Sequence, residues 1–254
     1  MADREPSPLD GKVALITGAA RNLPAVIAGE LAAAGAAVAL GDVAGEEELG
    51  ALVDTIRRQG GSAAMFMADV SRREQAERMV AQAADELGTI DILVNGAGPF
   101  TLTPFQALRE EEWDRIMDVN LKAVYLLAQL VAPNMRDKGW GRIINFSACS
   151  ADHRNPSVYS LSKNALRFLT QSMAHELAPA ITVNAISPGQ IAESAPDISA
   201  YDPALLERAI EHTLTGRLVT RREISHMIVL MCTPAFDSVT GQIIRMDGGW
   251  SIPR

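Results

Sequence analysis

The chain has 254 residues, of which 48% are hydrophobic and 21% are charged, and its formal net charge is -8. This composition excludes fibrous, low-complexity and disordered classes, and the length predicts one large α/β domain with a substantial core. The acidic balance argues against nucleic acid and anionic membranes as partners, because both bind clustered Lys and Arg.

The domain prediction follows from the absence of a visible linker. Residues 1–10 are expected to form a flexible N-terminal tail, and residues 11–254 a single domain. The first ten residues contain no apolar segment of the signal-peptide type, and we expect no later segment that spans a membrane. Cys149 and Cys232 match no metal-binding spacing, so we expect free thiols, a cytoplasmic protein and no metal site.

Seven short runs of β-branched or apolar residues follow one another along the chain, separated by helical patterns. Runs of this length suit strands buried on both faces, and helical crossovers between successive strands imply a parallel sheet. The expected fold class is therefore a doubly wound α/β fold with a seven-stranded parallel sheet, of the Rossmann-like type. The runs begin at Val13, Ala37, Ala63, Asp91, Arg142, Ile181 and Gln242.

The first run leads into TGAARNLPAVIAGEL, Thr17–Leu31, which is typical of a phosphate-binding turn followed by a helix. Glycines in such a turn let the backbone approach a pyrophosphate, which the helix N-terminus then binds. Gly18 is present, but Asn22 and Pro24 stand where two glycines are expected. Pro suits a first helical turn and Asn22 is a good N-cap, so we expect the helix to begin here. We interpret the loop as a working cofactor loop that is weakened or reshaped.

Short polar residues recur where the predicted strands end, and together they indicate a ligand site at the carboxyl edge of the sheet. Asp42 ends the second run, at about the distance from Gly18 at which a dinucleotide fold places the acidic residue that binds the adenosine ribose. The residues at these ends are Thr17, Gly18, Asp42, Asp69, Asn95, Ser147 and Ser187.

Eight short motifs, taken in order and spacing, make the sequence resemble the short-chain dehydrogenase/reductase family from about Leu9 to Ser251. The resemblance implies an NAD(P)-dependent oxidoreductase that moves a hydride between the nicotinamide and an alcohol or ketone. The motifs are TGAAR at Thr17, GD at Gly41, ADV at Ala68, NGAG at Asn95, DVNLKAVY at Asp118, YSLSK at Tyr159, VNAISPG at Val183 and MDGGW at Met246.

Tyr159 and Lys163 carry most of the chemical content of this resemblance. They lie four residues apart and therefore on one face of a helix. A phenol titrates near ~10, but a close ammonium favours the phenolate, so we expect a lowered pKa and an acid/base role for Tyr159. The resemblance implies that Lys163 also holds the nicotinamide ribose and that Asn120 anchors a water on the proton path. Asn120 is alternatively a polar residue bonded locally within its helix.

The cofactor contacts implied by the resemblance include the acidic residue after the second strand. The carboxylate of Asp42 would accept the ribose hydroxyls but repel a 2′-phosphate, so NAD is expected in preference to NADP. Arg21 could meet a phosphate and offset this preference. The assigned positions are Gly18, Arg21, Asn22, Leu23, Asp42, Asp69, Val70, Asn95, Gly96, Tyr159, Lys163, Pro188, Gly189 and Ile191.

Two further positions depart from the family pattern. Ala148 stands where the catalytic serine is expected, and Glu193 stands where a hydroxyl residue usually meets the cofactor. Ser147 suits a count backward from Tyr159, whereas Ser150 shares the face of Ala148 if extended geometry continues. Both serines therefore remain candidates for the catalytic position.

The segment 190–216 follows the strand that ends at the nicotinamide, so we expect it to form a lid over the substrate. It contains five acidic residues and one basic residue between Glu193 and Glu211, which disfavours a phosphorylated, CoA-linked or carrier-protein-linked substrate. A small neutral substrate is expected. His153 precedes Tyr159 in a loop, where it either touches substrate or is an exposed histidine.

Two long segments, Glu111–Lys138 and Ser157–Ala178, have more apolar positions than one buried face requires. The equivalent helices pair in members of the resembled family, so we expect a homotetramer, or a homodimer. The departures at the glycine positions, Ala148 and Glu193 leave two other functions open. These are a non-redox reaction on the same fold and a non-enzymatic binding protein.

Overall fold

A computed structural model describes residues 7–151, 157–194 and 203–252. Its seven strands form one parallel sheet in the order β3-β2-β1-β4-β5-β6-β7, which confirms the predicted doubly wound fold. The strands are β1 Val13–Thr17, β2 Ala37–Asp42, β3 Ala63–Met67, β4 Ile92–Val94, β5 Gly141–Phe146, β6 Ile181–Pro188 and β7 Ile243–Met246.

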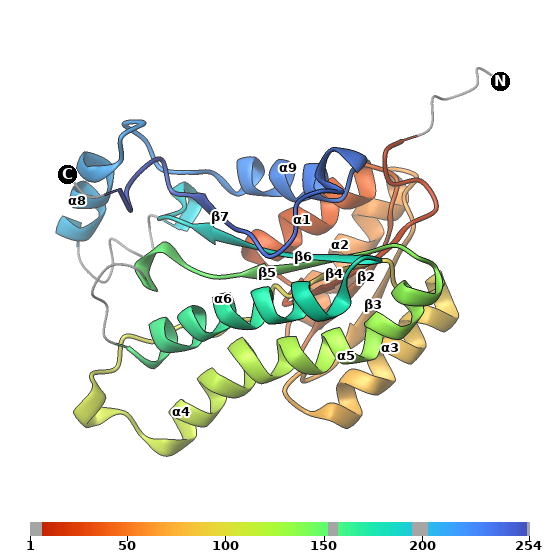
Figure 1. Cartoon of the computed structure of the whole chain (residues 1–254), viewed down its shortest axis with the longest axis horizontal. Coiled ribbons are helices and arrows are strands. Elements are labelled where there is room, and N and C mark those ends of the chain that lie inside the picture. The colour runs from red at the N-terminus through yellow and green to blue at the C-terminus, as the bar shows by residue number, and fades with distance from the viewer. Residues whose placement is uncertain (1–6, 152–156, 195–202, 253–254) are drawn as a thin grey trace.

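Helices cover both faces of the sheet, α1, α2 and α9 on one and α3, α5 and α6 on the other (Figure 1). Their bounds are α1 Asn22–Ala33, α2 Glu46–Arg58, α3 Arg73–Leu87, α4 Glu110–Met117, α5 Ala123–Asp137, α6 Val158–Leu177, α8 Pro203–His212 and α9 Arg221–Met231.

The strand β1 shows why the core divides into two layers. Val13 and Leu15 pack into the cluster on the α3, α5 and α6 side, whereas Ala14 and Ile16 pack into the cluster on the α1, α2 and α9 side. Successive strand residues point to opposite faces, so a continuous apolar run buries both faces of the sheet.

The first long helix that the sequence predicted runs through α4 and α5, and a π-helical turn, Asp118–Lys122, joins the two parts. Such single π turns are frequent at functional sites, and this one contains the buried Asn120. The whole helix Glu110–Asp137 is long and apolar enough to cross a membrane by length and composition. Half of its most apolar window is buried inside the protein, as in a core helix.

The expected N-terminal tail is partly folded, and the expected lid is partly described. Within the expected tail, Leu9 is 1% exposed and its N–H donates to the carbonyl of Ala34, so residues 7–10 are part of the fold. Residues 195–202 of the expected lid lie outside the described residues. The lid residues on either side of them form the 3-10 turn Ala192–Ser194 and the helix α8.

Candidate active site

The strand order reverses between β1 and β4, and there the two loops that follow these strands touch at their backbones. A Cβ on Gly18, which has φ +70°, would lie 2.8 Å from the Cα of Ala97. A Cβ on Gly96 would lie 2.5 Å from the carbonyl oxygen of Thr17 and 2.8 Å from Cγ of Pro24. Glycine is therefore required at both positions, and Pro24 packs on Gly96 beside them.

The loop between β1 and α1 adopts a left-handed backbone conformation at Asn22, where the family pattern has glycine. Asn22 has φ +58° and, within the described part of the chain, is the sole non-glycine residue in the left-handed region, which Asn tolerates better than most residues. The prediction of Asn22 as N-cap is wrong. The exposed Arg21 occupies that position with no side-chain cap, and α1 begins at Asn22. Leu23 is buried beneath the loop.

Asp42 connects the end of β2 to this loop. Its Oδ2 accepts a hydrogen bond from the N–H of Ala20 at 3.0 Å, and its Oδ1 accepts one from the N–H of Val43 at 2.7 Å. The N–H of Ala44 also donates to Oδ1, at 3.3 Å, and because a carboxylate has about four acceptor positions, about one remains for a ligand. Asp42 therefore positions the loop and still has capacity for a ligand.

The next two strand ends hold their polar side chains differently. Asp69 accepts hydrogen bonds from the hydroxyl and N–H of Ser71, at 2.6 and 3.0 Å. Burial raises the pKa of Asp69, but these bonds and the guanidinium of Arg72 outweigh it, so its pKa is lowered. Val70, beside it, is buried.

Asn95 uses its side-chain amide in the core. Its Nδ2 donates to Oδ1 of Asn145 at 2.8 Å, and the amide of Asn145 donates to the hydroxyl of Thr170 at 3.0 Å. This buried chain links β4, β5 and α6. The backbone N–H groups of Asn95 and Gly96 are also used within the protein, since they donate to the carbonyls of Ile144 and Val94 at 2.9 and 3.0 Å.

The predicted nicotinamide residues lie at the end of β6 and directly after it. The N–H of Gly189 donates to the carbonyl of Met246 at 3.0 Å, and a Cβ on Gly189 would lie 2.8 Å from the Cα of Asp247. Ile191 then pairs with Val219 in a parallel bridge. Pro188, Gly189 and Ile191 are thus held by the C-terminal strand and by the segment before α9.

Tyr159, Lys163 and Asn120 converge on the loop after β4. The Nζ of Lys163 lies 5.7 Å from the centre of the Tyr159 ring. A Cβ on Gly98 would lie 2.7 Å from Oδ1 of Asn120 and 3.3 Å from Nζ of Lys163, so both side chains reach the same glycine. The Nδ2 of Asn120 donates to the carbonyl of Pro99 at 3.0 Å, but its buried Oδ1 has no hydrogen-bond partner within the described structure.

The expected lowering of the Tyr159 pKa is wrong for the protein without a ligand. Burial raises the pKa of Tyr159 to about 12, and burial also lowers the pKa of Lys163 to about 8. The reason is that desolvation disfavours the charged form of each group more than their mutual interaction favours it. Tyr159 is therefore a neutral phenol at neutral pH, and the site offers a proton donor.

The two candidate serines differ in what surrounds them. The Oγ of Ser147 donates to the carbonyl of Lys163 at 3.0 Å and accepts from Nε of Arg167 at 2.7 Å. Arg167 also donates to the carbonyl of Ala148 at 2.9 Å. Ser147 is thus engaged with the helix that carries Lys163, whereas Ser150 lies partly buried in the 3-10 turn Cys149–Ala151.

Three residues near the site were not predicted. The ring of Phe100 meets the ring of Tyr159 edge-on at 4.8 Å between centroids, and Phe100 directly follows the NGAGP segment, which was the available signal. Arg167 is one turn beyond Lys163, so its spacing also pointed to this face. Arg221 begins α9 and donates its N–H to the carboxylate of Glu193 at 3.1 and 3.2 Å. No local sequence pattern predicts this contact between Arg221 and Glu193. His153 lies outside the described residues.

Comparisons with known proteins agree with this geometry over nearly the whole chain. The family model described as enoyl-(acyl carrier protein) reductase matches residues 18–251. The short-chain reductase protein NovJ of Streptomyces niveus is 36% identical over 244 residues, which cover 93% of each chain. The chain belongs to the short-chain dehydrogenase/reductase family.

Solved structures of this family superpose closely on the chain. A gluconate 5-dehydrogenase from Burkholderia cenocepacia, in complex with NADP and tartrate, has a TM-score of 0.91 at 32% identity and covers 98% of both chains. A 7α-hydroxysteroid dehydrogenase, complexed with NADH and 7-oxo glycochenodeoxycholic acid, has a TM-score of 0.90 at 33% identity, with 98% coverage of both chains. This short-chain dehydrogenase/reductase is accordingly an oxidoreductase that acts with a nicotinamide cofactor.

The residues present fit such a cofactor. The buried Oδ1 of Asn120, which has no hydrogen-bond partner within the described structure, provides an acceptor near Lys163. In the described part of the chain, no group of three or more His, Cys, Asp or Glu side chains could hold a metal ion. The candidate cofactor residues remain those at the ends of β1, β2, β3, β4 and β6, together with Tyr159 and Lys163.

Proposed function

We propose that the protein transfers a hydride between NAD and a small, neutral alcohol or ketone, with Tyr159 as the acid/base. The observation that carries this proposal is that Lys163 and Asn120 meet at Gly98, with the Nζ of Lys163 5.7 Å from the centre of the Tyr159 ring. The family relationship favours this redox reaction over a non-redox step or a purely binding role.

In the direction of carbonyl reduction, each site residue has its own role. A reduced nicotinamide held by these residues would supply the hydride for the carbonyl carbon. Tyr159, whose pKa is raised to about 12 by burial, is protonated and donates its proton to the carbonyl oxygen. The nearby Lys163 stabilises the phenolate that remains. Asn120, through its unpartnered Oδ1, accepts a hydrogen bond from the water that returns the proton.

Serine 150 is the better candidate for a hydroxyl beside the substrate. Ser147 already donates to the carbonyl of Lys163 and accepts from Arg167, so it positions the helix. The partly buried Ser150 lies in the 3-10 turn Cys149–Ala151, two residues after Ala148. We therefore assign the substrate-binding hydroxyl to Ser150.

The preference for NAD rests on Asp42. Asp42→Asn keeps an acceptor for the N–H of Ala20 but removes the charge that opposes a 2′-phosphate. We expect the ratio of kcat/KM for NADP to that for NAD to rise at least tenfold in this variant. Steady-state kinetics with both cofactors measure the ratio, and the exposed Glu47→Gln serves as control. An unchanged ratio would contradict the role of Asp42.

The proposed substrate class is based on the side chains beside Tyr159 and on those of the expected lid. Phe100, which is 53% exposed, covers the edge of Tyr159 with an apolar ring. The lid helix α8 carries Glu207 and Glu211 on its exposed side, and these charges oppose anionic carriers. A small neutral carbonyl compound or alcohol fits these features better than a substrate joined to an acyl carrier protein.

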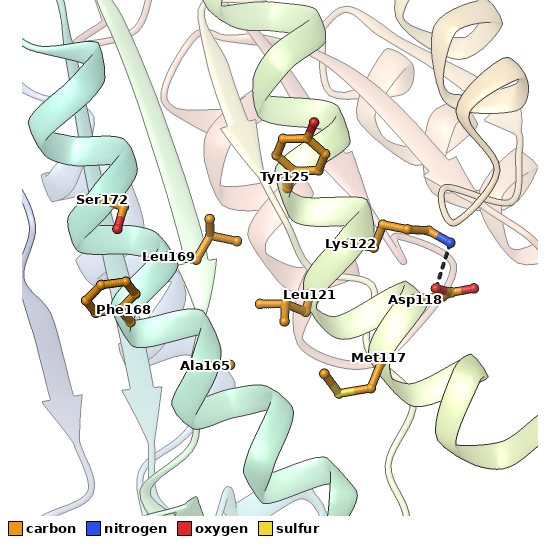
Figure 2. Close-up of a pocket in the computed structure, with 9 residues that line it drawn as sticks. All are labelled: Met117, Asp118, Leu121, Lys122, Tyr125, Ala165, Phe168, Leu169 and Ser172. Atoms are coloured by element: carbon orange, nitrogen blue, oxygen red, sulfur yellow. Dashed lines mark ion pairs between the residues drawn. The ribbon is translucent and has the colours of Figure 1, made fainter. Parts of the chain in front are cut away.

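A second copy of the chain is proposed to cover an apolar groove between the α4–α5 helix and α6. Figure 2 shows Leu169 of α6 and Leu121 lying between the two helices, and Phe168 and Tyr125 also line this groove. Phe168 is 74% exposed and Tyr125 is 42% exposed, and a self-complementary helix face is typical of symmetric dimers. We propose a homodimer through this groove, which a further interface extends to a homotetramer, in the cytoplasm.

Phe168→Glu tests this assembly. The added charges would face each other in a symmetric interface, so we expect the mass of the particle to fall to that of a smaller assembly. Light scattering coupled to size exclusion measures the mass. Phe105→Glu is the control, since Phe105 is 81% exposed in the loop before α4 and lies outside the groove. A monomeric parent protein would contradict the proposal.

The proposed activity is tested by following the absorbance of reduced nicotinamide with panels of neutral ketones and alcohols. We expect turnover of at least one neutral carbonyl compound with NADH. Isothermal calorimetry on the same protein measures NAD binding independently. An absence of both NAD binding and absorbance change at millimolar cofactor would overturn the proposed function.

A further inference from the structure

Two positions that depart from the family pattern, Asn22 and Glu193, meet at the residue Arg221. The Nη2 of Arg221 donates to Oδ1 of Asn22 at 3.0 Å and lies 3.4 Å from Oγ of Ser194. The backbone N–H of Arg221 donates to both carboxylate oxygens of Glu193. One residue at the start of α9 thus joins the first turn of α1 to the start of the lid.

The local sequence explains why Arg221 is held firmly. Thr220 is the N-cap of α9, and with Glu223 it forms a capping box in which each side chain accepts from the other's backbone N–H. Arg217 also forms an ion pair with Glu223, with 2.6 Å between Nη2 of Arg217 and Oε1 of Glu223. The capping box therefore fixes the backbone at Arg221, and with it the position from which the Arg221 side chain reaches Asn22.

The guanidinium of Arg221 has donor capacity that its protein contacts do not use. Within the described structure its Nε is buried and has no hydrogen-bond partner. Asn22 and Ser194 provide neutral acceptors, while the one carboxylate beside it, that of Glu193, is held by the backbone N–H of Arg221. A cation in this state, next to the N-terminus of α1, is suited to bind an anion.

We propose that Arg221 binds the nicotinamide-side phosphate of the cofactor and replaces contacts that the missing glycines at Asn22 and Pro24 would have allowed. This inference rests on the proposed NAD-dependent function. The nicotinamide-side phosphate is assigned because Arg221 also contacts Ser194, which follows the residues Pro188 to Ile191 that would border the nicotinamide. Arg221 also offsets the charge of Glu193 near that phosphate, which explains how the loop tolerates an acidic residue there.

The test compares Arg221→Met with Arg222→Met in cofactor binding. Met keeps an unbranched apolar stem but removes the guanidinium. Arg222 is the matched control because it is the neighbouring arginine and its Nε lies 3.7 Å from Glu30 on the exposed side. Calorimetry measures dissociation constants of NAD and of AMP, which contains only the adenosine-side phosphate.

For Arg221→Met we expect the affinity for NAD to fall at least tenfold, while the affinity for AMP changes less than twofold. Arg222→Met should leave both within twofold. Arg221→Lys should recover part of the NAD affinity, because it restores the charge but not the planar pair of donors. It also keeps the test open if Arg221→Met fails to fold.

The Glu193→Gln variant, made alone and together with Arg221→Met, adds a double-mutant cycle to this test. Its gain in NAD affinity should be larger with Met at position 221 than with Arg, because the carboxylate then lacks its compensating cation. Equal NAD affinity in Arg221→Met and the parent, or an equal loss for NAD and AMP, would overturn the inference. A parent protein that binds no NAD would instead overturn the proposed function.

Discussion

Replacement of Tyr159 by Phe is expected to lower turnover by at least two orders of magnitude while the protein remains folded and binds its cofactor. The ring and its edge-on contact with Phe100 remain, so the packing that places the loop is kept. Only the hydroxyl is lost, and with it the proton donor of the reaction. A hundredfold loss corresponds to about 2.7 kcal/mol of transition-state stabilisation. Steady-state kinetics and cofactor calorimetry measure the two effects separately.

Tyr125→Phe is the matched control, since it also removes one phenol hydroxyl but from the exposed face of α5. It should retain full turnover. Ser150→Ala should lower kcat with little change in melting temperature, whereas Ser147→Ala should lower the melting temperature, because Ser147 joins Lys163 and Arg167 in the fold. If Tyr159→Phe retains more than a tenth of the parent turnover, the assignment of the proton donor is wrong.

Replacement of Lys163 by Ala is expected to lower both turnover and cofactor affinity, each at least tenfold. Lys163 is 5% exposed and its Nζ lies beside Gly98, Asn120 and the ring of Tyr159. The variant removes the cation that stabilises the phenolate and the donor expected to hold the nicotinamide ribose. The measured quantities are kcat, from saturating cofactor, and the dissociation constant of NAD from calorimetry.

The pH dependence gives this prediction a second readout. Burial lowers the pKa of Lys163 to about 8, so the free enzyme loses this positive charge as the pH rises through that value. The affinity of the parent for NAD should therefore fall as the pH rises from 7 to 9, and that of Lys163→Ala should not. The control is Lys122→Ala, because Lys122 is half-exposed and pairs with Asp118 on the surface of the same site helix. Loss of only one of the two quantities in Lys163→Ala would contradict its dual role.

Periodicity and turn chemistry predicted the fold because they act locally. The strand pattern located all seven strands, and helical crossovers set their parallel order. The spacing of Tyr159 and Lys163 placed both on one face of α6, where they remain. Strand ends shifted by one or two residues, as with β3, which ends at Met67 rather than Asp69, since local pattern does not record where pairing stops.

The features that escaped prediction depend on groups far apart in the sequence. The pKa of Tyr159 rises because the folded chain removes water from it, which spacing to one lysine cannot show. Ser147 points to Arg167, a contact made only when β5 packs on α6. Asn22 adopts the left-handed conformation at the start of α1, and its partner Arg221 comes from the far end of the chain. Long-range packing decided each of these three positions.

The central claim, that this chain performs a hydride transfer, is tested most directly with NADH in which both hydrogens at the nicotinamide C4 position are deuterium. The substrate is a neutral ketone identified in the absorbance assay, and mass spectrometry with NMR locates the label in the product. We predict one deuterium on the carbinol carbon of the alcohol, with loss of this product in Tyr159→Phe. A product that forms without deuterium on that carbon, or an equal yield in the absence of nicotinamide, would contradict the claim.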